Sequence, residues 1–285
     1  MTGLTFVIPW HNRPELQISL EQNRDIFSEA GVSVLLVNGG GDCEELHRIL
    51  ARADVPNCCP IDMPDAEFNK CCSLNVGVAC SDTEDVFLLD ADVILDPMAV
   101  SEAREALVPG TFVTLRKAEE LRPEMHENVL RGLDCLLERR VITELTFRNE
   151  RTAITEFWHG LQGRSLNGLA LLSRSDYIAV GGCNSQLSGW GFEDQDFQIR
   201  LQVQLGLKRL SMGSAIHITH AQAPASERVA NEQRNVAVCF ENYNNDRFLG
   251  TFPTDVAEWL PKLRELRRSS RRCEQPGAVS AAPSQ

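Results

Sequence analysis

Short apolar runs alternate with helix-type patterns along the first hundred residues of the chain. The runs are rich in β-branched residues and end at turn residues, which is typical of buried strands. Strands are predicted over residues 4–8, 32–37, 58–61 and 86–89, with helices from about Pro14 and over 43–53 and 69–80. Asn12 is expected to cap the first helix. Strands that alternate with helices predict an α/β fold with a mostly parallel central sheet flanked by helices.

Beyond residue 97 the pattern is more polar and less regular. Residues 97–164 are mostly helical in pattern, with one strand predicted over 111–115. The elements expected after them are a strand over 167–172, a helix over 193–205 and two short strands that end near His217.

The 285 residues are 43% apolar and 24% charged, which is typical of a globular domain. One domain is expected over residues 1–268, with halves of 1–100 and 101–268. Residues 269–285 have almost nothing apolar to bury and are expected to form a disordered tail. The formal net charge of −12 argues against nucleic acid as the main partner, because phosphate binding requires Lys and Arg.

The ten cysteines are scattered or adjacent, with no CxxC pair and no Cys/His zinc spacing. Free thiols in a reducing compartment are therefore expected. The first residues lack a signal-peptide pattern, and no apolar run approaches the ~20 residues that span a bilayer. A cytoplasmic location is predicted. The basic stretch 260–272 is either a solvated tail or a weak peripheral contact with anionic membrane.

Asp90-Ala91-Asp92 directly follows the last apolar strand of the first half. Ligands of open α/β sheets bind beyond the carboxyl ends of the strands. Two carboxylates at i and i+2 repel each other unless a cation lies close, and such oxygen ligands suit Mg²⁺ or Mn²⁺. The alternative interpretation is an acidic turn at a strand end.

The segment Gly189–Asp196 places Trp190 between two glycines, and acidic residues follow. An indole face can stack on a sugar. Glu193 and Asp194 would lie in the first turn of the next helix, where the helix dipole stabilises ionised carboxylates. Such a carboxylate can act as a general base. Alternatively, the acids only cap the helix.

His217 and His220 are three residues apart. From a turn or helix both imidazoles can reach one metal ion, whereas a strand would point them to opposite faces. Most such pairs are not ligands, but a suspected divalent ion nearby favours this interpretation.

Residues 9–13, Pro-Trp-His-Asn-Arg, lie at the end of the first predicted strand. Arg13 could pair with a phosphate and Trp10 could pack against a base. The alternative is an ordinary strand-to-helix turn. The glycines over 39–41 do not form a Rossmann fingerprint, and no P-loop motif exists.

Four segments match one family's motifs in the family's order, within residues 4–220. Residues 9–13 resemble its P-F-R-N-R, and residues 68–77, Phe-Asn-Lys-Cys-Cys-Ser-Leu-Asn-Val-Gly, resemble F-N-R-A-x-x-L-N-V-G. Residues 90–98 resemble D-V-D-x-I-P-M with two extra residues, and 188–196 resemble W-G-W-G-x-E-D-D-D. The chain thus resembles the GT-A glycosyltransferases, most closely the β-1,4-galactosyltransferase type and bacterial enzymes of the chondroitin-polymerase kind.

This resemblance implies a GT-A fold and a metal-dependent transfer, with inversion, of a Gal, GalNAc or GlcNAc type sugar from a UDP-sugar. The acceptor would be a hydroxyl of a carbohydrate or glycoconjugate. Residues 1–100 would bind the nucleotide and 101–268 the acceptor. The implied donor-binding residues are Pro9, Trp10, Arg13, Asn38, Asn69, Lys70, Asp90 and Asp92. The implied ligands of Mn²⁺ or Mg²⁺ are Asp92, His217 and His220.

The resemblance also makes Asp194 the catalytic base, with Glu193 holding the acceptor or orienting the site. Trp190 and Gly191 would form the acceptor side. Ser165 stands where galactosyl-specific members carry Tyr, which implies room for an N-acetylhexosamine. The chain departs from the family at three positions: His217 replaces Met, Ser188 replaces the first Trp and His11 replaces Arg.

Two alternatives within the fold remain open. One is a retaining enzyme of the polypeptide N-acetylgalactosaminyltransferase kind, which shares a related G-W-G-x-E motif. The other is a nonenzymatic sugar-binding module on the same fold. A nucleotidyltransferase is disfavoured because no glycine-rich N-terminal loop with Arg exists for a triphosphate.

Overall fold

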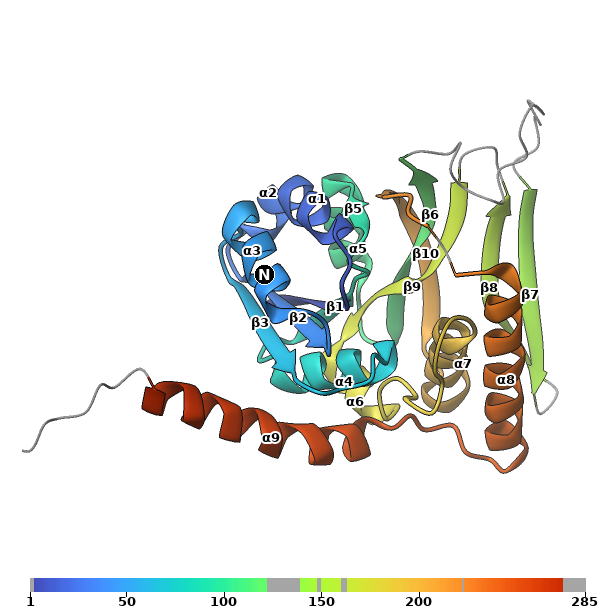
Figure 1. Cartoon of the computed structure of the whole chain (residues 1–285). Helices are drawn as coiled ribbons and strands as arrows, with labels where there is room; N and C mark the ends of the chain where they lie inside the picture. Colours follow the sequence, from blue (N-terminus) through green and yellow to red (C-terminus); the bar gives the residue numbers. More distant parts are fainter. Residues whose placement is uncertain (1–2, 122–138, 148–149, 160–162, 222, 274–285) are drawn as a thin grey trace, which may run out of the picture.

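The structure is a computed structural model that describes residues 3–121, 139–147, 150–159, 163–221 and 223–273. Side chains are described for residues 3–121, 168–221 and 223–266. The side chain of Ser165 and residues 274–285 of the expected tail lie outside these ranges. Figure 1 shows a central twisted sheet with helices on both faces and a separate hairpin at one side.

The first half alternates strands and helices, as its pattern predicts. Its elements are β1 (Leu4–Trp10), α1 (Glu15–Gln22), α2 (Arg24–Phe27), β2 (Val32–Gly39), α3 (Cys43–Ala53), β3 (Cys58–Met63), α4 (Lys70–Cys80) and β4 (Asp85–Leu88). The strands β3, β2, β1 and β4 are neighbours in this order, and all three pairs are parallel.

The second half adds longer strands. Its elements are β5 (Val93–Leu95), α5 (Pro97–Ala106), β6 (Thr111–Glu120), β7 (Arg139–Phe147), β8 (Glu150–His159), β9 (Gly163–Ser173), α6 (Arg174–Ala179), α7 (Glu193–Leu205), β10 (Lys208–His217), α8 (Ala225–Asn244) and α9 (Phe252–Cys273). Helix α9 reaches Cys273, so the first residues of the expected tail are helical. None of the helices in the described part of the chain combines the length and apolarity needed to cross a membrane.

The eight-stranded sheet has the order β3-β2-β1-β4-β9-β6-β10-β5. β9 runs antiparallel to β4 and β6, β10 is parallel to β6, and β5 is antiparallel to β10. The sheet is therefore mixed, which corrects the expectation of a mostly parallel sheet. All pairs among β3, β2, β1 and β4, the strands linked by helices, are parallel. The antiparallel pairs come from β9 and β5 in the second half.

The strand predicted over 111–115 is confirmed and is longer than expected, because β6 covers residues 111–120. The helical prediction is wrong for residues 139–147 and 150–159, where β7 and β8 form a two-stranded antiparallel hairpin, and residues 122–138, 148–149 and 160–162 lie outside the described residues. These segments are rich in Thr, Val, Ile and aromatic residues, which favour strands although charged residues stand between them. Likewise, the two short strands expected before His217 are one strand, β10, in which Gly213 has a positive φ of 70°.

Asn12 does not cap α1. The N-cap position is Pro14, without a side-chain hydrogen bond, and Asn12 has a φ of 52°. The Oδ1 of Asn12 instead accepts from the Asp42 backbone N–H at 2.7 Å, at the start of α3. Asn12 therefore ties together the loops that follow β1 and β2.

The apolar core has two main layers, one on each face of the sheet. Strand β1 is buried throughout, so Phe6 and Ile8 face one layer and Val7 faces the other. The first layer packs against α1 and α3, and the second packs against α4 and α9. A smaller cluster joins α7 to α8. Because both faces are covered, the polar side chains that follow the strands gather at the sheet edge.

Candidate active site

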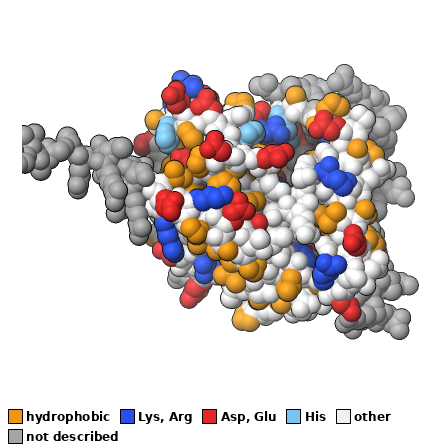
Figure 2. Space-filling view, turned by 60° about the horizontal axis from the view of Figure 1, so that its bottom comes forward, with side chains coloured by type: hydrophobic (Ala, Val, Ile, Leu, Met, Phe, Trp, Pro, Cys, Tyr) orange, Lys and Arg blue, Asp and Glu red, His pale blue; other side chains and the backbone are white. Residues whose placement is uncertain are grey.

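Most of the predicted site residues lie where strands end or helices begin. Asp90 and Asp92 lie between β4 and β5, and His217 ends β10. Lys70 is the first residue of α4, and Glu193 and Asp194 open α7. On the face seen in Figure 2, basic, acidic and histidine side chains lie beside a hollow in the surface. Two contact clusters can be distinguished among these residues.

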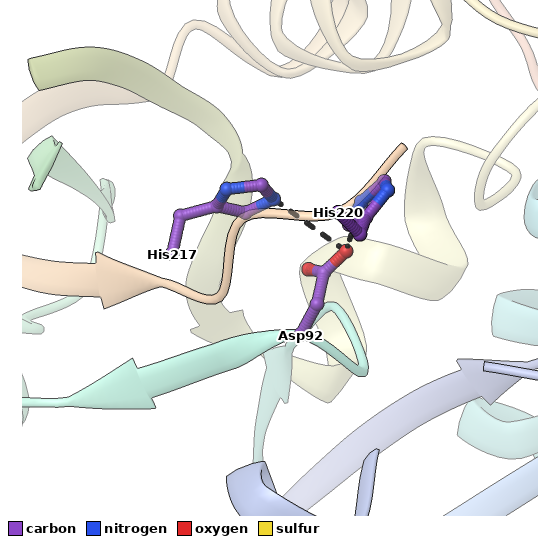
Figure 3. Close-up of side chains that lie close together, drawn as sticks. All are labelled: Asp92, His217 and His220. Carbon is purple, nitrogen blue, oxygen red and sulfur yellow. Dashed lines mark ion pairs between the residues drawn. The ribbon is translucent and has the colours of Figure 1, made fainter. Parts of the chain in front are cut away.

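The first, the metal-type cluster, consists of Asp92, His217 and His220. Its ligand atoms all lie within 4.8 Å of one another. The Oδ2 of Asp92 is 2.9 Å from Nε2 of His220 and 3.5 Å from Nε2 of His217. In Figure 3 the two imidazoles point toward the carboxylate from the end of β10 and from the loop after it. The expected meeting of these three residues is confirmed, because the chain leaves the strand between the two histidines.

A second carboxylate orients His217 from behind. Glu120 Oε2 accepts from Nδ1 of His217 at 2.8 Å and from the Thr219 hydroxyl at 2.9 Å. Metal-binding imidazoles commonly use their other nitrogen in this way, which fixes the tautomer. Sequence reasoning missed Glu120. It ends β6 directly opposite His217 on β10, and this pairing has no local signal in the sequence.

The donor set suits a transition-metal ion. Backbone hydrogen bonds from Ile218 N–H to Asp92 O at 2.8 Å and from Leu121 N–H to His217 O at 2.9 Å hold the ligands in place. Imidazoles bind Mn²⁺ and later transition metals, whereas Mg²⁺ prefers sites of oxygen ligands alone. Two imidazoles with one carboxylate therefore fit a divalent transition-metal ion better than Mg²⁺.

Arg13 reaches this cluster from the loop after β1. Its Nη1 lies 2.8 Å from Nδ1 of His220, and this imidazole nitrogen also lies 2.8 Å from the carbonyl oxygen of Ala221. A guanidinium beside a metal-type cluster places positive charge next to a prospective cation, which is unfavourable unless an anion joins them. The arrangement suits an anionic ligand such as a phosphate.

The second cluster, the carboxylate cluster, consists of Lys70, Asp90, Glu193 and Asp194. The ammonium of Lys70 lies 3.0 Å from Oδ1 of Asp90 and 3.3 Å from Oδ1 of Asp194. Burial alone would lower the pKa of Lys70, but the nearby carboxylates outweigh it and hold this pKa well above its ordinary value. Because Asp90 and Asp92 are two residues apart, the two clusters are neighbours.

Glu193 and Asp194 have different surroundings. Burial, followed by the charge of Asp194, raises the pKa of Glu193 to about 7, although Lys70 opposes the shift. The Oε2 of Glu193 is buried and has no hydrogen-bond partner in the described part of the chain. Asp194 instead contacts Lys70. Two adjacent carboxylates in unlike environments are a pattern found in acid–base sites.

Gly168 makes room for Asp194. A Cβ atom at this position of β9 would lie 2.6 Å from Cγ of Asp194, closer than such contacts allow. Only glycine lets the carboxylate approach the strand so closely. Sequence reasoning did not single out Gly168, which lies in the strand predicted over 167–172.

The loop before α7 is held by α8. Gly189 and Gly191 have φ of 73° and 105°, and Phe192 has φ of 70°. Asn235 donates from Nδ2 to the carbonyl of Gly191 at 2.8 Å. Trp190 is 51% exposed, and the guanidinium of Arg228 lies 5.4 Å from its ring centroid. The loop therefore presents Trp190 at the surface.

Other predicted site residues are structural in their contacts. Trp10 is fully buried and donates from Nε1 to Arg13 O at 2.8 Å, and the packing of its ring against a base stays a prediction. Pro9 is buried in β1. Asn38 is buried. Its Nδ2 donates to the carbonyl of Gly41 and to Oδ1 of Asp62, and its Oδ1 accepts from the Gly41 N–H.

Asn69 also has a local structural task. It is the N-cap of α4, accepts from the Cys72 N–H and donates to the carbonyls of Ser185 and Leu187. It therefore joins the start of α4 to the segment that leads into the Trp190 loop.

Comparisons with known proteins concern one segment of the chain and its fold. Residues 152–221 match the family model described as the N-terminal domain of galactosyltransferase. The match includes Asp194, His217 and His220. The fold is similar to that of mannosyltransferase PcManGT from Pyrobaculum calidifontis, solved with GDP-Man and Mn²⁺, at a TM-score of 0.51 and 15% identity over 96% of this chain and 81% of that chain. The chain has a glycosyltransferase fold.

A crystal structure of a mycobacterial protein is also similar, with a TM-score of 0.54 and 16% identity over 84% of this chain and 74% of that chain. No curated protein sequence matches the chain. The family model and the fold together support a GT-A glycosyltransferase and not a more specific type. The α/β class expected from the sequence is confirmed, with the mixed sheet as its correction.

Proposed function

We propose that this protein is a metal-dependent glycosyltransferase that moves a Gal, GalNAc or GlcNAc type sugar from a UDP-sugar to an acceptor hydroxyl with inversion. The observation that carries the proposal is the position of Asp92, His217 and His220 next to Lys70, Asp90 and Asp194 in a glycosyltransferase fold. One cluster suits a metal ion that binds a diphosphate, and the other suits proton transfer.

The donor site is assigned to the metal-type cluster and its surroundings. Asp92, His217 and His220 would hold Mn²⁺ or Mg²⁺, which when bound supplies positive charge that stabilises a departing diphosphate. Arg13 would pair with the same diphosphate. Asp90 would hold the ribose. Pro9, Trp10, Asn38 and Asn69 would support the donor site by holding in place the strand ends and loops that surround it.

The acceptor site is assigned to the start of α7. The acceptor oxygen would attack the anomeric carbon of the sugar while its proton passes to the carboxylate of Asp194. The bond from the anomeric carbon to the diphosphate oxygen breaks, and its electron pair leaves with the diphosphate. Glu193 would hold the acceptor, and Trp190 with Gly191 would form the adjoining surface.

Nucleotide binding tests the proposal without an acceptor. Calorimetry of UDP and GDP with Mn²⁺, and then with EDTA, should give metal-dependent binding of UDP by the wild-type protein. Asp92→Ala removes the carboxylate shared by both histidines, so we expect nucleotide affinity to fall at least about 100-fold. Asp82→Ala, at an exposed position away from the site, is the matched control.

Binding of GDP in place of UDP would move the donor class toward that named for the archaeal mannosyltransferase. The absence of binding to either nucleotide would contradict the proposal. With a donor identified, NMR of the product's anomeric centre separates inversion from retention. Nucleotide-sugar binding without transfer to any acceptor or to water would favour the sugar-binding module.

A further inference from the structure

Lys70 connects carboxylates from the two halves of the chain. Its ammonium is 3.0 Å from Asp90, which follows β4 in the first half, and 3.3 Å from Asp194, which opens α7 in the second. The start of α4 is fixed, because the N-cap Asn69 bonds the carbonyls of Ser185 and Leu187. The ammonium is therefore held between the donor side and the acceptor side of the site.

These surroundings are unsuited to binding a phosphate. One ammonium between Asp90 and Asp194, with Glu193 nearby, leaves this cluster net negative when the carboxylates are ionised. A diphosphate would be repelled by the cluster as a whole. Arg13, which contacts the metal-type cluster, is the better placed cation for that purpose. The contacts of Lys70 therefore point to a role different from the donor binding that the resemblance implies.

The two carboxylates at the start of α7 compete for a proton unless their surroundings differ. Like charges at adjacent positions favour the protonation of one of them. The ammonium of Lys70 contacts Asp194, and Gly168 lets the carboxylate of Asp194 lie against β9. Glu193 is enclosed, and burial, followed by the charge of Asp194, raises its pKa to about 7, so its surroundings disfavour its ionised form. The ammonium thus favours ionisation at Asp194.

We propose that Lys70 is a positioning residue for the transfer step, which holds Asp194 ionised and oriented so that Asp194, and not Glu193, accepts the acceptor's proton. This inference rests on the proposed function. The proton moves from the acceptor hydroxyl to Asp194, and Lys70 keeps its own protons throughout. By contacting Asp90 as well, Lys70 also fixes the distance between the donor side and the base.

Among the residues whose side chains the structure describes, the carboxylates that act on Lys70 are Asp90 after β4, and Glu193 and Asp194 on α7. The neighbouring thiol of Cys71 has a pKa raised well above its ordinary value by its hydrogen bond to Cys183 and by burial, so it stays neutral. A change in the acid limb of a rate profile thus reports on the carboxylates.

The test compares Lys70→Met, which keeps length without charge, with Lys70→Arg, which keeps charge. Lys208→Met, at an exposed lysine of β10, is the matched control. UDP binding with Mn²⁺ is measured by calorimetry, and turnover is measured as UDP release from the UDP-sugar that the wild type uses, from pH 5 to 9. For Lys70→Met we expect UDP affinity within about threefold of wild type and kcat lower by about 100-fold.

The pH profile gives the sharper prediction. Removal of a nearby cation disfavours the ionised carboxylate, so the acid limb of kcat should move to higher pH by about one unit. The loss is therefore larger at pH 6 than at pH 8. Lys70→Arg should restore the wild-type limb, and Lys208→Met should leave both quantities unchanged. A loss of UDP affinity of tenfold or more with an unmoved acid limb would overturn the proposal and return Lys70 to donor binding.

For variants whose turnover is too slow to measure, the protonation of Asp194 can be followed by NMR without substrate. In protein labelled with ¹³C at the Asp carboxyls, the titration midpoint of Asp194, assigned through Asp194→Asn, should rise by about one unit in Lys70→Met. Lys70→Gln serves if the Met variant does not fold. An unchanged midpoint contradicts the inference even where UDP binding is normal. Absence of UDP binding by the wild type contradicts the proposed function instead, so the two failures are distinguishable.

Discussion

The metal-type cluster and the carboxylate cluster are neighbours, but they are built differently. Asp92 and His217 adjoin strands and are held by backbone hydrogen bonds, and Glu120 supports His217 from the paired strand. Lys70 and Asp194 begin helices of different halves and are held by ion pairs between side chains. Because the sheet fixes one cluster and side-chain charges fix the other, a mutation in one cluster should leave the function of the other intact. This separation is what the proposed division between donor binding and transfer requires.

The largest expected effect tests whether the carboxylate cluster acts in transfer alone. Asp194→Asn keeps the shape of the side chain but removes its ability to take a proton. We expect kcat to fall by about 10²–10⁴-fold, with UDP affinity in Mn²⁺ unchanged. Calorimetry and steady-state kinetics on one preparation measure both, with Asp25→Asn on α2 as the control. Full transfer activity in Asp194→Asn would remove the base assignment.

The contrast between the clusters also explains what the sequence could predict. Asp90 and Asp92 follow an apolar strand directly, and Glu193 and Asp194 follow a glycine-flanked Trp, so local pattern was enough to select them. The first four strands and the helices between them were predictable for the same reason. Each element there is short, has a clear period and ends at turn residues.

Contacts across the sheet had no such local signal. Glu120 reaches His217 only because β6 pairs in parallel with β10, 97 residues later. Trp10 carries an indole ring of the kind that stacks on bases, yet tertiary packing buries it. The hairpin of β7 and β8 contains enough charge to resemble a surface helix, and only its β-branched and aromatic residues favoured strands. Long-range pairing decided these cases.

A smaller effect is expected when a side chain is added at Gly168, against which the carboxylate of Asp194 packs. In Gly168→Ala the new methyl would collide with the carboxylate, whose Cγ lies 2.6 Å from the ideal Cβ position, so Asp194 must move. A displacement of about 1 Å can cost about 100-fold in kcat. UDP affinity should not change, because the metal-type cluster is untouched.

Gly206→Ala is the matched control for this prediction. Gly206 has a φ of 64° at the end of α7, with nothing within 4 Å of its ideal Cβ position. Alanine there should lower the free energy of unfolding by about 1 kcal/mol without changing kcat. Denaturant unfolding and kinetics of both variants check the pair. Equal losses of kcat in the two variants would show that the effect of Gly168→Ala is only a loss of stability.

The smallest expected effect concerns the support behind the metal-type cluster. Glu120→Gln can still accept the hydrogen bond from Nδ1 of His217, but it lacks the negative charge that strengthens the imidazole as a ligand. We expect Mn²⁺ affinity, measured by electron paramagnetic resonance without nucleotide, to fall about tenfold. Thr219→Val removes a second donor to the same carboxylate and should change the affinity less than about threefold. Since Glu120 is remote from the carboxylate cluster in its contacts, kcat at saturating Mn²⁺ should stay within a factor of about two in both variants. A fall in kcat at saturating Mn²⁺ would mean that the two clusters are coupled, and that the strand-built site also orients the transfer step.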